Sequence, residues 1–426
     1  MIDTKTAIEK ITNGEFDNLF TDIYIDSSMI DYQKKRYVHA IEQYETIFCP
    51  DKVAIFSAPG RSEVCGNHTD HQHGMVLATS INLDTIAVSA KNNNDVVRFV
   101  SDGYDMITLD INDLEVNNDE AGTTVSLIRG VLRGLKDHGY KIGGFNAYAT
   151  SDVLVGAGLS SSAAFEVVVG TIISGLYNDM KINSVEIAQI SQYAENVFFK
   201  KPCGLMDQMA CSVGGMVNID FKDPTKPIVK KVPTEFEKYD YSLCIVDTKG
   251  DHVDLTDDYA MIPSEMKKVA NFLGEDYLRD CDSNEFYIRL DEIREAVGDR
   301  PVLRAIHFFN EEYNVKNAVS SLENGKFVEF LDAIRKSGNS SFKYLQNVYT
   351  TRDIQHQNIS VALALSESLL RNYGVCRVHG GGFAGTIQAF VKNEFVSNYK
   401  EFINKIFGEN SCHVLKVRKY GGIKVM

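Results

Sequence analysis

Residues 153–170, VLVGAGLSSSAAFEVVVG, are the most informative stretch of the chain. An apolar strand end leads into two glycines, three serines and a helix that begins with small residues. Glycine lets backbone N–H groups approach an anion closely, and the helix N-terminus behind it offers unpaired donors and the positive end of a dipole. The pattern predicts a phosphate-binding loop. The alternative is an ordinary strand-to-helix loop capped by Ser160 or Ser161.

The composition is that of a globular protein. The chain has 426 residues, of which 44% are hydrophobic and 24% charged, enough for roughly two to three units with their own cores. The formal net charge of -14 argues against nonspecific binding to nucleic acid or to an anionic membrane. There is no run of about 18 apolar residues and no signal-like start, so we expect a cytosolic protein without a membrane span.

Disulfide and metal chemistry find little support in the sequence. The eight cysteines are scattered without a CxxC pair, which favours reduced thiols over a disulfide framework or a zinc site. The run HTDHQH at 68–73 contains good zinc ligands, but no second cluster completes a site. This run is either a solvated loop or part of a sugar pocket in which His68 and Asp70 meet hydroxyl groups.

Hydrophobic periodicity predicts an α+β fold with helices covering a sheet face. We expect helices at residues 30–48, 123–140, 160–177, 184–200 and 394–407, and a mostly helical period over 254–373. We expect strands at residues 53–57, 75–90, 96–101, 106–111, 144–155, 214–221, 241–247 and 414–418, and on both sides of a glycine cluster at 380–385. Residues 222–231, KDPTKPIVKK, are the best internal boundary, which predicts two domains at 1–222 and 223–426.

Other nucleotide-binding signatures are missing from the sequence. The chain contains neither GxxxxGK[ST] nor the HRD and DFG motifs of protein kinases. Residues 380–385 satisfy GxGxxG, but TIQAFV follows as a strand, where a dinucleotide fold needs a helix. We therefore reject a dinucleotide site, and a packed glycine turn between strands remains the alternative.

Two carboxylates about a dozen residues apart, Glu195 and Asp207, flank a predicted helix end. If the chain folds back there, one can hold magnesium while the other accepts a hydroxyl proton. Arg61 can pair with Asp207 and lower the pKa of that carboxyl, which keeps it ionised, or it can form a purely structural salt bridge.

Five segments in this order carry a family resemblance: SAPGR at 57–61, GNHTD at 66–70, GAGLSSSAA at 156–164, CGLMDQ at 203–208 and GGGFAG at 380–385. Over nearly the whole chain they resemble the ordered motifs of the GHMP small-molecule kinases, and most of all the galactokinase branch. The resemblance implies a two-domain fold with the active site in the interdomain cleft. It also implies ATP-dependent phosphorylation of a sugar at its anomeric hydroxyl.

The resemblance further implies a role for each matched residue. Asp207 corresponds to the catalytic carboxylate, and Arg61 to the arginine that pairs with it and stabilises transferred charge. Ser162 and Glu195 correspond to the Mg²⁺ ligands. The triphosphate of ATP is expected on Gly156, Ala157, Gly158, Leu159, Ser160, Ser161 and Ser162. The sugar is expected on Asn67, His68, Asp70, Gly204 and Tyr259.

The sequence departs from the galactokinase pattern at the sugar loop. Galactokinases usually have GEHTDY, whereas this chain has GNHTDH, so Asn67 replaces the glutamate expected to contact the exocyclic C6 hydroxyl. An amide loses the charge and gains donors. The expected activity is phosphorylation of galactose at C1. The alternatives are a kinase for galacturonate or N-acetylgalactosamine, motivated by Asn67, and a sugar-sensing protein without catalysis.

Overall fold

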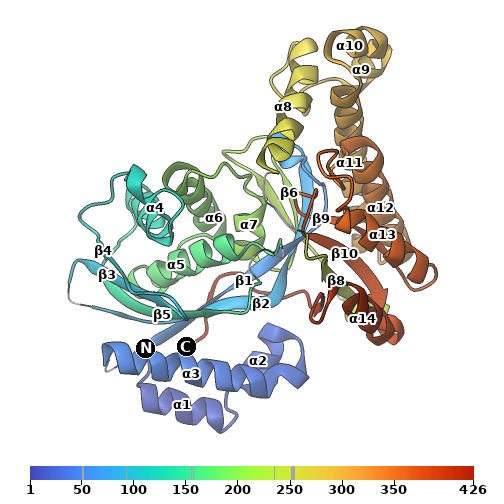
Figure 1. The fold of residues 1–426 in the computed structure, drawn as a ribbon. Helices are drawn as coiled ribbons and strands as arrows, with labels where there is room; N and C mark the ends of the chain where they lie inside the picture. The colour runs from blue at the N-terminus through green and yellow to red at the C-terminus, as the bar shows by residue number, and fades with distance from the viewer. Residues whose placement is uncertain (50–51, 93, 155, 157, 235, 251–254) are drawn as a thin grey trace.

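The computed structural model describes residues 1–49, 52–92, 94–154, 156, 158–234, 236–250 and 255–426. Within these residues the strands form two sheets, one of eight strands and one of four, and helices pack on both faces of each. This mixture confirms the predicted α+β class (Figure 1).

The larger sheet has the order β12-β1-β2-β5-β3-β4, with β6 paired to β2 and β7 paired to β6. Among the described strands of this sheet only β3 and β5 pair in parallel. The strands are β1 Ala54–Cys65, β2 Met75–Lys91, β3 Val96–Ser101, β4 Ile107–Asp110, β5 Phe145–Ser151, β6 Met216–Asp220, β7 Ile228–Val232 and β12 Ile423–Lys424.

Strand β1 shows why this sheet is covered on both faces. Successive side chains of a strand point to opposite sides, so a strand that is apolar at consecutive positions needs two cores. Phe56 and Ala58 pack into a core with helices α4 to α7, whereas Ile55 packs against α1 to α3. Figure 1 shows these two sets of helices on opposite faces of the sheet. The helices are α1 Thr4–Thr12, α2 Asp17–Tyr24, α3 Ile30–Phe48, α4 Thr124–Asp137, α5 Ser161–Tyr177, α6 Ser184–Tyr193 and α7 Met206–Val213.

The smaller sheet has the antiparallel order β11-β8-β10-β9 and the same alternation. On β8, Leu243 and Ile245 face α11 and α12, while Cys244 and Val246 face α13 and α14. The strands are β8 Tyr241–Asp247, β9 Gly374–His379, β10 Thr386–Lys392 and β11 Cys412–Leu415. The helices are α11 Asp299–Glu323, α12 Phe327–Ser340, α13 Asn358–Leu369 and α14 Asn393–Phe407.

Three further helices, α8 Thr256–Phe272, α9 Ser283–Ile288 and α10 Leu290–Val297, gather around one end of α11 and project from the body of the molecule (Figure 1). None of the helices in the described part of the chain is long and apolar enough to cross a membrane.

The C-terminal end of β1 joins the two sheets. Gln388 on β10 donates from Nε2 to the backbone oxygen of Glu63 at 2.8 Å, and Arg377 on β9 donates from Nη1 to the backbone oxygen of Val64 at 2.9 Å. The residues that follow Arg61 on β1 therefore lie between the halves of the chain, and this junction contains the candidate site.

Most expected elements are confirmed, and the differences have physical reasons. We expected the first strand to stop before Pro59-Gly60, but β1 continues through them to Cys65 with a bulge between Pro59 and Arg61. Pro59 is the last residue paired before this irregularity, which leaves Gly60 without a partner, and prolines within sheets occur beside such bulges. The segment 222–231 is not an unstructured boundary throughout, because β7 begins within it and pairs with β6. The division into domains at residue 222 stays a prediction. Strands β7 and β12 come after residue 222 in the sequence, yet both belong to the larger sheet, whose other strands come before it.

Candidate active site

A cavity of about 250 Å³ lies where the end of β1, the loop after it, the start of α7 and the glycine turn before β10 meet. Its lining consists of Arg61, Glu63, Asn67, His68, Asp70, His71, Lys201, Pro202, Cys203, Gly204, Met206, Asp207, Gly380 and Gly381. The structure therefore brings together both predicted catalytic residues and four of the five predicted sugar-binding residues. Tyr259 is the exception.

Asp207, in the first turn of α7, forms a two-pronged ion pair with Arg61 on β1. Arg61 donates from Nε to Oδ1 and from Nη2 to Oδ2, both at 2.6 Å, and Ser160 also donates its hydroxyl to Oδ2. Burial tends to raise the pKa of Asp207, but the Arg61 charge and these hydrogen bonds outweigh it and hold the pKa below its usual value. Asp207 is therefore ionised at neutral pH, as the sequence predicted for a paired carboxyl.

The predicted phosphate loop lies directly beside this ion pair. Arg61 also donates from Nη1 to the backbone oxygen of Gly158, and its own backbone N–H donates to the oxygen of buried Leu159 at 3.1 Å. Gly156 and Gly158 have φ of +80° and +66°, which favours glycine. Ala157 lies outside the described residues. The loop thus contacts Arg61 of this ion pair through backbone atoms.

Helix α5 begins immediately after the loop with its amide groups available. Ser160 is the N-cap residue at φ 57°, and it makes no side-chain cap hydrogen bond. Its hydroxyl is directed to Asp207 instead. Ser161 and Ser162 occupy the first turn, so this end of α5 presents backbone donors and the positive end of the helix dipole toward the loop. This geometry favours the anion-binding interpretation over an ordinary capped loop.

The second predicted carboxylate lies beside the same helix end. Glu195, in the π-helical turn Ala194–Phe199, accepts a hydrogen bond from the Ser162 hydroxyl at 3.3 Å. Gln208 donates to Glu195 at 2.6 Å and Lys201 at 3.0 Å. Burial tends to lower the pKa of Lys201, but the charge of Glu195 outweighs it and raises that pKa. Ser162 and Glu195 are brought together as predicted.

The loop after β1 forms the other wall of the cavity. Asn67 is fully buried and donates to the Gly380 oxygen at 2.7 Å, while His68 Nε2 lies 3.0 Å from the Gly381 oxygen. Burial, with a smaller effect of neighbouring His71, lowers the pKa of His68 to about 3, so this imidazole is neutral in the physiological range. Both residues attach the loop to the glycine turn of the other half.

Asp70 and Gly204 lie against each other in the lining of the cavity. A Cβ placed on Gly204 would lie 1.8 Å from Asp70 Oδ2, a distance at which atoms collide. Only glycine at 204 lets the Asp70 carboxylate come this close to the backbone that precedes α7.

Tyr259, near the start of α8, lies behind the glycine turn rather than in the cavity lining. Its hydroxyl donates to the Gly382 oxygen at 2.8 Å, and its ring meets Phe383 edge-on with centroids 5.4 Å apart. A Cβ on Gly381 would lie 2.4 Å from the Tyr259 ring. In this arrangement Tyr259 supports the glycine turn, and its contact with sugar stays a prediction.

Sequence reasoning missed two charged residues of the lining, Glu63 and Lys201. Glu63 lies between the matched segments 57–61 and 66–70, and Lys201 just before the segment 203–208. A single charged residue is usually solvated, so neither carried a signal by itself. Their positions next to Arg61 and Cys203 were the available hints.

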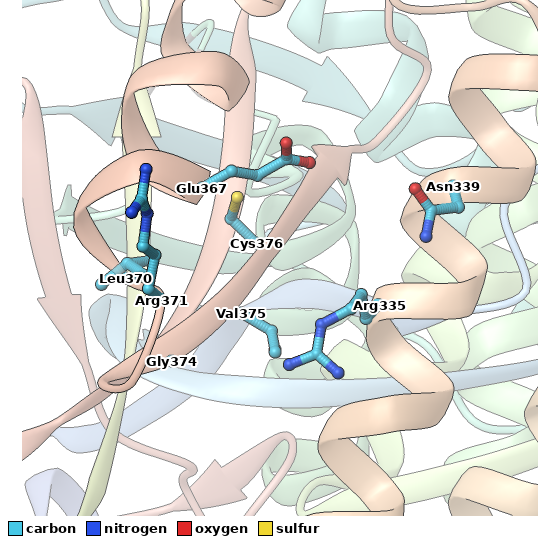
Figure 2. A pocket seen from close by; sticks show the side chains of 8 residues that line it. All are labelled: Arg335, Asn339, Glu367, Leu370, Arg371, Gly374, Val375 and Cys376. Carbon is cyan, nitrogen blue, oxygen red and sulfur yellow. The ribbon is translucent and has the colours of Figure 1, made fainter.

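Another cavity, of about 270 Å³, lies in the C-terminal half (Figure 2). Arg335 and Asn339 project from α12, Glu367 and Arg371 come from the opposite side, and Cys376 on β9 lies between them. Within the described residues it adjoins neither the 156–162 loop nor a paired carboxylate, so the first cavity remains the candidate active site.

Comparison with known proteins gives the family. Two family models match: the GHMP kinases N terminal domain over residues 126–215 and the galactokinase galactose-binding signature over residues 42–91. The galactokinase of Limosilactobacillus reuteri (strain DSM 20016) is 30% identical over 381 residues, which cover 86% of this chain and 93% of that protein. The galactokinase of Streptomyces coelicolor is 28% identical, with 82% and 88% covered.

Solved structures agree at the level of the fold. The Lactococcus lactis galactokinase complexed with galactose superposes with a TM-score of 0.76 at 23% identity, covering 90% of this chain and 98% of that one. A mevalonate kinase superposes with a TM-score of 0.58 at 16% identity, covering 85% and 99%. Because the Limosilactobacillus reuteri galactokinase is 30% identical over 86% of this chain and both family models match, the chain belongs to the galactokinase family of the GHMP kinases.

Proposed function

We propose that this protein is a galactokinase that transfers the γ-phosphoryl group of ATP to the anomeric C1 hydroxyl of galactose. The observation that carries the proposal is the position of Asp207. It is ionised, held by Arg61 and Ser160, and lines the polar cavity next to the N-terminal end of α5. Family membership supports the same activity.

Asp207 orients the attacking hydroxyl. In the reaction a bond forms between the C1 oxygen and the γ-phosphorus, the bond from that phosphorus to the β–γ bridging oxygen breaks, and ADP leaves. The hydroxyl proton passes to Asp207. A carboxylate whose pKa lies below the usual range is a weak base, so it first accepts a hydrogen bond and takes the proton as the new bond forms.

Arg61 and the helix start stabilise the charge of the transferred group. Phosphoryl transfer depends mainly on positioning and on neutralising negative charge spread over the phosphoryl oxygens. Arg61 supplies a positive charge fixed by Asp207 and by the Gly158 carbonyl, and α5 supplies backbone donors. Both are in place before the reaction, which lowers the cost of reorganisation.

Residues Ser162 and Glu195 fit a magnesium ion. Their oxygens lie 3.3 Å apart, a separation that two ligands at about 2.0–2.1 Å from one ion can adopt, and Mg²⁺ prefers such hard oxygen donors. When bound there with ATP, the ion neutralises phosphate charge. Glu195 Oε1 also accepts from Lys201 at 3.0 Å, so the ion would share this carboxylate with a lysine.

The test is an ATP- and Mg²⁺-dependent turnover assay with galactose, glucose, galacturonate, N-acetylgalactosamine and arabinose, with ³¹P and ¹³C NMR locating the new phosphate. We expect galactose to react best and to carry phosphate on C1. A preference for another sugar by more than about tenfold would contradict the proposed substrate. Galactose binding without turnover of any sugar would support the sensor alternative. The cytosolic location stays a prediction.

A further inference from the structure

The side chain of Asn67 has no hydrogen-bonding capacity left for a ligand. Its Nδ2 donates to the Gly380 oxygen at 2.7 Å and to the Glu63 carboxylate at 3.1 and 3.2 Å. Its Oδ1 accepts from Asn347 Nδ2 at 2.8 Å and from the Ser341 hydroxyl at 3.3 Å. An amide has two donors and one acceptor oxygen, and all of them are occupied by protein groups. Asn67 therefore holds the loop in place rather than contacting a sugar.

Glu63, the carboxylate beside Asn67, does keep hydrogen-bonding capacity for a ligand. Glu63 lines the cavity, and its side chain is only 3% exposed. Its Oε1 accepts from both Asn67 and Arg377 Nη2, the latter at 2.8 Å. In the described residues Oε2 accepts only the Asn67 contact at 3.2 Å. A carboxylate has about four lone-pair sites, so Oε2 keeps acceptor capacity on a residue that lines the cavity.

Such a group selects a hydroxyl. A buried carboxylate oxygen with free lone pairs recognises a donor, and leaving either partner unpaired carries a desolvation penalty. The Glu63 oxygens lie within hydrogen-bond distance of the side chain at position 67, which the family resemblance assigns to the exocyclic end of the sugar.

We propose that Glu63 is a specificity-determining residue whose carboxylate accepts a hydrogen bond from the exocyclic C6 hydroxyl of galactose, with Asn67 as the positioning residue that holds it. This inference rests on the proposed function and names the residue that reads the substrate. It removes the reason to expect galacturonate, because a carboxylate at C6 has no hydroxyl proton to donate to Glu63 Oε2.

The same geometry explains why position 67 carries an amide. A glutamate at 67 would place a second carboxylate next to Glu63 inside a buried site, and only one positive group, Arg377, contacts Glu63 in the described residues. It would also lose the donor to Gly380. Like charges at such distances disfavour each other strongly where water is excluded.

The experiment compares Glu63→Gln with wild type on galactose, 6-deoxygalactose and galacturonate. For wild type we expect kcat/KM to be at least about tenfold higher on galactose than on 6-deoxygalactose, and higher still relative to galacturonate. In Glu63→Gln we expect kcat/KM on galactose to fall about tenfold or more, chiefly through KM, while 6-deoxygalactose changes by less than about threefold. The ratio between the two sugars therefore shrinks.

The matched control is Glu311→Gln. Glu311 is another fully buried carboxylate near Arg377, accepting from the Gly66 N–H at 3.0 Å, but it does not line the cavity. We expect a lower melting temperature and an unchanged ratio between galactose and 6-deoxygalactose. If Glu63→Gln does not fold, Glu63→Asp, which keeps the charge and withdraws the oxygens by one methylene, is expected to shrink the ratio in the same direction.

An unchanged ratio in a folded Glu63 variant overturns the inference, as does wild-type protein that accepts galacturonate as well as galactose. Failure of the proposed function is a separate result, because it shows as no galactose turnover by wild type. In that event the ratio is measured from the dissociation constants of the same sugars by calorimetry, with the same expected shrinkage.

Discussion

The two ends of the cavity are built differently. At the phosphate end, Arg61, Asp207 and Ser160 all come from the first 207 residues, and each belongs to a recognisable motif. At the sugar end, Asn67 is bound to Gly380 and Asn347, residues 313 and 280 positions away along the chain. The phosphate end is thus built by contacts within the N-terminal half, and the sugar end by contacts between the two halves. We expect changes at the phosphate end to affect kcat and changes at the sugar end to affect KM and substrate choice.

The largest expected effect is that of Asp207→Asn. The amide keeps the size of the side chain but loses the charge that orients and accepts the hydroxyl proton, so kcat should fall about 100- to 10,000-fold. Calorimetry should give a galactose dissociation constant within about threefold of wild type, because the sugar end is untouched. Near-normal turnover would remove Asp207 from the catalytic role, and a comparable loss of galactose affinity would mean that the two ends are not separable.

Arg61→Lys should have the next largest effect. Lysine keeps the charge but cannot make both contacts to Asp207 and reach Gly158, so we expect kcat to fall about 10- to 100-fold. The two hydrogen bonds from Arg61 help to hold the pKa of Asp207 low, and lysine can make only one of them, so the substitution should raise that pKa and move the acid limb of the kcat/KM profile to higher pH. Arg129→Lys is the matched control, since Arg129 forms the same two-pronged pair with Glu120 on an outer helix. A profile that stays in place would contradict the coupling.

Glu195→Gln should change the Mg²⁺ concentration that the enzyme requires more than it changes the affinity for galactose. Losing one carboxylate ligand should raise the Mg²⁺ concentration for half-maximal activity about tenfold or more. Binding of Mg²⁺-ATP measured by calorimetry provides a readout apart from turnover. Glu186→Gln on α6 removes a carboxylate that contacts Tyr140 and should change neither quantity. Equal Mg²⁺ dependence in all three proteins would exclude Glu195 as a ligand.

The smallest expected effect concerns acid stability at the sugar end. The folded pKa of His68, about 3, lies below the ordinary value of 6.5, so the unfolded chain binds the proton first as the pH falls. His68 therefore contributes to a loss of stability that begins as the pH falls below about 6.5 and continues toward the folded pKa. Urea unfolding at about pH 7 and about pH 5 should show a smaller loss for His68→Gln than for wild type. The exposed His138→Gln variant should keep the wild-type loss, and an unchanged loss in His68→Gln would contradict the burial effect.

The same contrast governs what could be predicted from the sequence. The proximity of Arg61 to Asp207 and of Ser162 to Glu195 followed from motifs whose order and residue types imply one chemistry. Glu63 was missed because its partner Arg377 lies on β9, and no local pattern connects the two. Asn67 was interpreted as a sugar contact because the sequence does not show that Asn347 and Gly380 occupy its amide.

Fold prediction failed where tertiary pairing overrides local signals. Pro59-Gly60 marks a chain break by composition, yet β2 supplies a full partner strand and a bulge absorbs the irregularity. The segment 222–231 is polar and proline-containing, yet β6 offers an edge with which its last residues pair. Periodicity located α3 at residues 30–48 because its buried face repeats at helical spacing.

The most direct test is a crystal structure of the protein with galactose, Mg²⁺ and a non-hydrolysable ATP analogue. We predict that galactose occupies the cavity with its C1 hydroxyl within hydrogen-bond distance of Asp207 and its C6 hydroxyl on Glu63, while the triphosphate lies on the start of α5. Galactose bound elsewhere, or in the reverse orientation with C6 toward Asp207, would contradict the assignment of the two ends.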